Sequence, residues 1–88
     1  MKIRDGFMLR EVAGQWIVVP LGENVANING IMALSVSAAL LWRKLEVGVA
    51  GCGELADVLL GEYMVDKATA LADSEEFVEI LRSKELLE

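Results

Sequence analysis

Apolar and polar side chains alternate near the start of the chain in the manner of half-buried β-strands. Phe7–Val12 shows this alternation, and residues 16–19 form an aromatic and β-branched run that Pro20 closes. Between the two runs, Gly14 can adopt the positive φ that a tight turn requires. The pattern therefore predicts a β-hairpin whose turn spans residues 13–15.

A third short strand is expected over residues 28–34, after a loop that Gly22 and Asn24 mark. Gly30 lies inside this strand, where a glycine weakens pairing and commonly marks a bulge. Because the connections between the strands are short, the predicted sheet is antiparallel with the order one, two, three. Its first and third strands are then edges that leave backbone groups free to pair.

From Ser35 onward the apolar residues recur at three-and-four spacing, which is typical of amphipathic helices. Ser35 is the expected N-cap of a first helix that Gly48 ends. A second helix is predicted over residues 54–63 and a third over residues 67–83, with Asp66 as its N-cap. The apolar faces of the three helices are expected to be Ala38, Leu41, Trp42 and Leu45; then Leu55, Val58, Leu59 and Tyr63; then Ala70, Ser74, Phe77 and Leu81.

Three strands followed by three helices predict an α+β fold in which the helices cover one face of a small antiparallel sheet. Leu86 and Leu87, beyond the last helix, are expected to fold back on the core. The 88 residues contain no repeat, linker or low-complexity stretch, and they suffice for a single domain over residues 1–88.

Composition narrows the chemistry that this domain can perform. The chain has no histidine and one cysteine, Cys52. A zinc site of Cys and His ligands, an intramolecular disulfide and histidine-based catalysis are therefore excluded, and we expect neither a cofactor nor an enzymatic activity. A single cysteine fits a reducing compartment, and no apolar run has the length of a signal peptide or a membrane span. A cytoplasmic location is expected.

Two further groups of side chains favour no catalytic role. Cys52 lies between two glycines, and no histidine is present to activate its thiol. The carboxylates of the third predicted helix are expected on its outer, solvated faces; they are Asp73, Glu75, Glu76 and Glu79.

The net charge of −6 is divided unevenly along the chain. Residues 1–45 carry five basic and three acidic side chains, whereas residues 46–88 carry three basic and eleven acidic ones. A helix-turn-helix that reads DNA needs basic residues on its recognition helix, and these acidic helices would repel DNA. The charge pattern therefore argues against a nucleic-acid partner.

Recognition of a peptide or protein is the interpretation that remains. An edge strand beside a helix can accept an extended peptide as an added strand. On the third predicted helix, Leu71 and Val78 flank the core face in line with Glu75 and Arg82, which makes this stripe more apolar than a solvated face requires. Ordinary partial burial of the stripe is the alternative, and both interpretations stay open at this point.

Several segments together resemble the PqqD-like family, also described as precursor-peptide recognition domains. Residues 6–14 followed by residues 17–20 are similar to the opening hairpin of the family. Residues 29–35 and residues 38–45, around Trp42, are similar to the third strand and the first helix of the family. The likeness is completed by residues 55–63, Val65, Asp66, Phe77, Leu81, Leu86 and Leu87, so that it covers essentially the whole chain.

The resemblance implies a winged helix-turn-helix-like fold that does not bind DNA. Such domains capture the leader segment of a ribosomally made precursor peptide and present it to a modifying enzyme, frequently a radical S-adenosylmethionine protein. The leader would lie as an extra strand between the third strand and the third helix. Carried over to this sequence, the strand wall of that groove is Asn27, Ile28, Asn29, Gly30, Ile31, Met32, Ala33 and Leu34, and the helix wall is Leu71, Ser74, Glu75, Val78 and Arg82.

The sequence departs from the family pattern at the start of the second helix and on the third. Gly-Cys-Gly at residues 51–53 replaces the usual capping box, so a loose start of the second helix is expected. Ser74 replaces a larger apolar residue, and Leu71 and Ile80 replace charged ones. The alternative function is a structural or regulatory interaction domain that forms a homodimer through the same edge strand.

Overall fold

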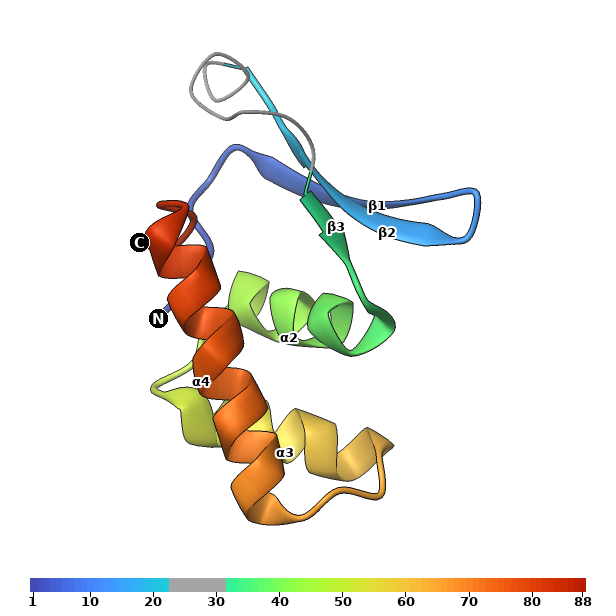
Figure 1. Ribbon diagram of the computed structural model, residues 1–88. Helices are drawn as coiled ribbons and strands as arrows, with labels where there is room; N and C mark the ends of the chain where they lie inside the picture. The colour runs from blue at the N-terminus through green and yellow to red at the C-terminus, as the bar shows by residue number, and fades with distance from the viewer. Residues whose placement is uncertain (23–31) are drawn as a thin grey trace.

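The computed structural model describes residues 1–22 and 32–88, which form a three-stranded sheet followed by three helices (Figure 1). The strands are β1 (Phe7–Val12), β2 (Gln15–Pro20) and β3 (Met32–Leu34). The helices are α2 (Val36–Val47), α3 (Cys52–Glu62) and α4 (Lys67–Ser83). The predicted α+β class and the predicted order of strands and helices are confirmed.

The hairpin of β1 and β2 is closed by a turn of two residues. Ala13 and Gly14 have φ angles of 53° and 81°, and positive φ at both central positions is the mark of a type I′ turn. Its twist matches that of the paired strands. The sequence-based turn over residues 13–15 was wrong by one residue, because Gln15 pairs with Val12 and so belongs to β2.

β3 pairs antiparallel with β2, with Trp16 opposite Leu34, which gives the sheet order β1-β2-β3 that the sequence predicts. Met32 and Leu34 are half-buried against the core, whereas Ala33 between them is exposed, as the alternation of side chains along a strand requires. The predicted third strand over residues 28–34 is confirmed for its last three residues; residues 28–31 lie outside the described residues.

The ends of α2 and the start of α4 follow the predicted capping residues. The Oγ atom of Ser35 accepts a hydrogen bond from the Ala38 amide at 3.2 Å, and Gly48 ends the helix with a φ of 107°. Asp66 is the N-cap of α4, but its side chain makes no capping hydrogen bond. Its position was therefore predicted correctly, while its capping interaction was not.

α3 starts two residues earlier than the predicted Glu54. The Glu54 carboxylate accepts a hydrogen bond from the Ala50 amide, one residue before the N-cap, and so ties the first turn of the helix to the preceding chain. Gly51 stands at the N-cap and has no side chain that could cap the helix. The helix also ends one residue before the predicted boundary, since Tyr63 has extended backbone.

The core lies where the three helices meet beneath the sheet. Trp42, Leu45, Leu55 and Leu81 have no exposed surface, and Val18 of β2 packs onto the same cluster. Burying one large apolar side chain contributes about 1.5–3 kcal/mol, so these residues dominate the stability of the domain. The predicted helix faces supply this core, except that Tyr63 is exposed.

The last residues pack beside the first ones (Figure 1). Ile3 and Leu87 form an isolated antiparallel bridge, and the Arg4 amide donates to the Leu86 carbonyl at 2.9 Å. Leu86 is buried, so the predicted fold-back of this segment is confirmed. None of the helices in the described ranges is long and apolar enough to cross a membrane.

Candidate peptide-binding site

β3 lies at one end of the sheet. Its inner edge pairs with β2, and none of the other described strands pairs with its outer edge. The backbone N–H and C=O groups of such an edge can bind an extended peptide as a further strand. Because Met32 and Leu34 turn their side chains toward the core, this edge offers a peptide mainly backbone groups and the small side chain of Ala33.

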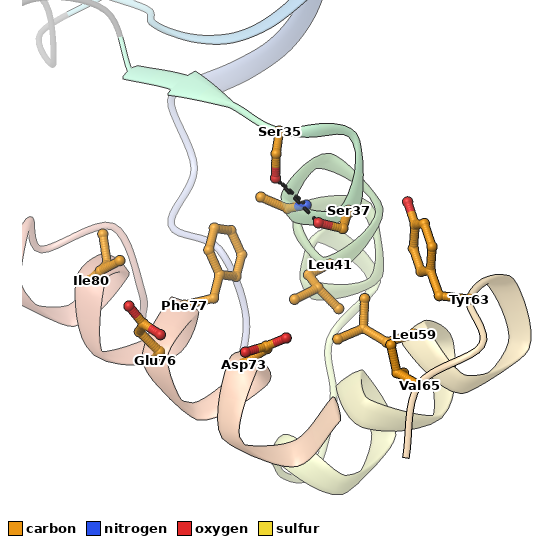
Figure 2. Close-up of a pocket in the computed structure, with 11 residues that line it drawn as sticks. Ser35, Ser37, Leu41, Leu59, Tyr63, Val65, Asp73, Glu76, Phe77 and Ile80 are labelled. Carbon is orange, nitrogen blue, oxygen red and sulfur yellow. Dashed lines mark hydrogen bonds between the residues drawn. The ribbon is translucent and has the colours of Figure 1, made fainter. Parts of the chain in front are cut away.

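A pocket opens immediately after β3, where Ser35 leads into α2. Its volume is about 370 Å³. Residues of all three helices and of the loop after α3 line it: Ser35, Ser37, Ala38, Leu41, Leu59, Tyr63, Val65, Asp73, Glu76, Phe77 and Ile80. Figure 2 shows Phe77 reaching from α4 into the space below Ser35, with Ile80 on one side and Tyr63 on the far side.

The walls of this pocket are mainly apolar and are exposed at the rim. Leu41, Leu59 and Phe77 are buried and belong to the core cluster, so they form a fixed floor. Ile80 is 42% exposed and Tyr63 is 39% exposed, which places both at the rim. Large apolar side chains that gather around a hollow in this way mark a binding surface more often than an ordinary solvated one.

The charged residues that line the pocket are both acidic. Asp73 and Glu76 are exposed, and neither belongs to an ion pair among the described residues. The Ser35 hydroxyl is engaged with the Ala38 amide and with the Ser37 Oγ atom at 3.2 Å. Within residues 1–22 and 32–88, no three His, Cys, Asp or Glu side chains form a cluster that could hold a metal ion.

The residues of the predicted strand wall and of the predicted helix wall differ in where the structure places them. Met32, Ala33 and Leu34 form β3, while residues 27–31 of the predicted wall lie outside the described residues. On α4, two of the predicted positions, Glu75 and Arg82, are exposed, and Leu71 is half-buried. The other two are buried: Ser74 is 0% exposed and Val78 is 2% exposed.

The buried pair on α4 has internal partners. The Ser74 Oγ atom donates to the Ala70 carbonyl at 2.8 Å, within the same helix, and Val78 belongs to the core cluster. Arg82 forms an ion pair with Glu79 at 3.2 Å and lies near the sulfur of Met1. For Val78, the alternative of ordinary burial that the sequence left open is the arrangement seen here.

None of the five predicted helix residues lines the pocket. Successive residues of an α-helix are rotated by about 100°. Leu71, Glu75, Val78 and Arg82 therefore lie on one flank of the buried face of α4. The pocket residues lie on the opposite flank, which lines the pocket together with Ser35 at the end of β3 (Figure 2).

Sequence reasoning assigned the pocket residues of α4 to other roles. Phe77 was placed in the core, which is correct, and Asp73 and Glu76 were placed on a solvated face. Ile80 was the signal that could have identified this flank as a binding surface. It is an apolar residue one turn from Phe77, at a position where a charged residue is usual. Which flank of α4 lines the pocket depends on the elements that pack against each flank, and the sequence pattern of one helix does not identify those elements.

The three-stranded sheet, its open β3 edge and the adjoining apolar pocket define a class of small α+β domains that can bind an extended peptide by strand addition. Residues 15–87 match the family of coenzyme PQQ synthesis protein D (PqqD), and the chain belongs to this family. The resemblance noted from the sequence is thereby confirmed. No curated protein matches the chain.

Two solved structures are similar to this one. The first is TbiB1 in complex with the TbiA(beta) leader peptide, with a TM-score of 0.78 and 28% sequence identity; the match covers 100% of this chain and 95% of that one. The second is a lasso peptide synthetase B1 complexed with the leader peptide, with a TM-score of 0.74 and 20% identity over 97% of this chain and 93% of that one. At that identity the second structure supports the shared fold alone.

Proposed function

We propose that this protein is a non-catalytic adaptor that binds the leader segment of a ribosomally synthesised precursor peptide and holds it for a modifying enzyme. The observation that carries the proposal is the open β3 edge that runs directly into an apolar pocket. It is supported by the similarity over the whole chain to TbiB1, whose structure contains a leader peptide.

Binding by strand addition would use the backbone of β3 for affinity and the neighbouring pocket for selectivity. An added strand pairs with the N–H and C=O groups of Met32–Leu34 irrespective of its sequence, because those groups are the same in every peptide. Residues of the leader that continue past Ser35 would then meet Phe77 and Ile80 in the pocket. This assigns the helix wall of the groove to the pocket flank of α4.

The adaptor role fits the chemistry of the chain. It has no histidine, and the acidic side chains of α4 that line the pocket are exposed. A leader that orders on binding gives up part of the interaction energy, so a dissociation constant on the order of 0.1–10 μM is expected. Holding the precursor beside its enzyme raises the effective concentration of the reacting segment. That the enzyme is a radical S-adenosylmethionine protein remains a prediction from the resemblance.

The test is a titration of ¹⁵N-labelled protein with the leader of a precursor peptide encoded beside this gene. We expect the largest shifts at the amides of Met32, Ala33 and Leu34 and on the pocket flank of α4. Shifts confined to the other flank, around Leu71, Glu75 and Arg82, would instead support the helix wall that the sequence predicts. Shifts that avoid β3 altogether would overturn binding by strand addition.

Self-association through β3 is the competing outcome. The mass of the protein in solution at low micromolar concentration, measured with and without the leader, separates the two. A monomer that binds one leader supports the adaptor. A tight dimer that the leader does not change would instead favour the structural interaction domain.

A further inference from the structure

We propose that the pocket selects a lysine or arginine of the leader, with the aliphatic stem of that residue in the pocket and its cationic end between Asp73 and Glu76. The inference rests on the proposed function and adds the chemistry of the bound side chain. It follows from the combination of an apolar hollow with a rim that carries charge of one sign.

The shape of the pocket suits a long side chain. A volume of about 370 Å³ can hold one or two side chains, and its floor of Leu41, Leu59 and Phe77 is fixed by the core. Lysine and arginine bury their methylene groups along apolar surface while keeping the charged end in water. A hollow that is buried at the floor and open at the rim matches that division.

The charge of the rim points to a cation. Asp73 and Glu76 are its charged residues, none of the lining residues is basic, and the ion pair found among the described residues joins Arg82 to Glu79 on the other flank. Two carboxylates that lack an internal partner leave a net negative potential over the mouth of the pocket. An aspartate or glutamate of the leader would be repelled at the same place.

The aromatic lining favours the same occupant. Phe77 and Tyr63 both line the pocket, and a cation that lies over an aromatic face gains attraction beyond that of a neutral side chain of equal size. The pocket begins at Ser35, directly after the end of β3. The leader residue that enters the pocket would therefore lie just outside the segment that pairs with β3. Selectivity would therefore come from a residue that flanks the added strand.

The experiment selects binders from a displayed library of random dodecapeptides on three forms of the protein. They are the wild type, the double variant D73N/E76Q and the double variant E46Q/D57N, which removes the same charge from exposed positions that do not line the pocket. All three should melt alike, since the substituted residues are exposed. We expect lysine or arginine beside a large apolar residue in the wild-type and E46Q/D57N selections, and no such preference with D73N/E76Q.

A synthetic peptide from the wild-type selection then gives the quantitative result. Replacing its basic residue by glutamine should weaken binding to the wild type by about two- to fivefold, the size expected for solvent-exposed charge pairs, and should leave binding to D73N/E76Q unchanged.

The outcomes separate the two proposals. Selected peptides that shift the β3 amides but show no basic preference, or the same preference with D73N/E76Q, would overturn this inference and leave the proposed function standing. A library from which no selected peptide shifts the β3 amides would overturn the proposed function and this inference with it.

Discussion

The guanidinium carbon of Arg43 lies 4.7 Å from the centroid of the Trp16 ring, which joins α2 to the middle strand of the sheet. Trp16 is paired with Leu34 at the end of β3, and Ser35 follows directly as the N-cap of α2. The contact therefore joins the strand that pairs with β3 to the helix that follows β3, and Ser35, which lines the pocket, lies between β3 and that helix. A cation this close to an aromatic ring contributes about 0.5–1 kcal/mol at exposed sites.

The variant R43Q should lower the free energy of unfolding by about 0.5–1 kcal/mol, because glutamine cannot make the cation–π contact. Urea denaturation followed by circular dichroism measures this difference. R10Q is the matched control, since Arg10 is an exposed arginine on β1. Equal stability of R43Q and R10Q would show that the Arg43–Trp16 contact contributes nothing.

The hairpin turn offers a stabilising substitution. Ala13 has a φ of 53°, which costs an L-residue with a Cβ atom about 1–2 kcal/mol, and asparagine tolerates this conformation better. A13N should therefore raise the free energy of unfolding by about 0.5–1 kcal/mol, as measured by denaturation. A13V should do the opposite because a β-branched residue is strained at positive φ. If A13N and A13V were equally stable, the turn would not have the type I′ geometry described here.

The start of α3 offers a second stabilising substitution. Gly51 has extended backbone, with φ −169° and ψ −178°, and a Cβ atom added there meets no neighbour within 4 Å. Serine at this position could cap the helix by accepting a hydrogen bond from the amide of Glu54, three residues further on. G51S should raise the unfolding free energy by about 0.5–1 kcal/mol.

The matched controls separate capping from backbone effects in this variant. G51A removes the flexibility of glycine without adding a hydroxyl, so G51S should exceed it. E54A should lose about 0.5–1 kcal/mol, because it removes the hydrogen bond to the Ala50 amide, and it should leave the advantage of serine over alanine in place. Equal stability of G51S and G51A would show that the serine hydroxyl does not cap the helix.

The sequence predicted the elements well because their signals are local. The cap at Ser35, the stop at Gly48 and the alternation of β1 each depend on residues within one turn or one strand. The errors at the element ends have equally local causes. Gln15 belongs to β2 because a two-residue turn satisfies the strand twist. α3 begins at Cys52 because the Glu54 carboxylate ties its first turn to the amide of Ala50.

The candidate site was less predictable because it depends on which elements meet. Met32–Leu34 form the edge strand that the sequence predicts, since an edge follows from the strand order. That a peptide pairs with this strand stays a prediction. The flank of α4 that faces the pocket depends on how α4 is rotated against α2 and α3. Val78 and Ile80 are both aliphatic and stand two positions apart, yet one is 2% exposed and the other 42% exposed.

This pair of residues supplies the sharpest prediction for the site. V78D would bury a charge without a partner in the core, at a cost of several kcal/mol, which is a large part of the stability of a small domain. We expect this variant to lose its cooperative thermal transition. I80N should melt like the wild type but bind the leader about tenfold more weakly, because it replaces an apolar contact at the rim of the pocket by a neutral polar group.

V47N is the matched control, since Val47 is 80% exposed at the end of α2 and does not line the pocket. Thermal melts and leader titrations on the three variants decide between the two flanks of α4. If I80N bound the leader as tightly as V47N does, the pocket would not contribute to recognition. If V78D folded and lost only its affinity for the leader, the groove would follow the other flank, where the sequence first predicted it, and α4 would have to rotate to expose that side chain on binding.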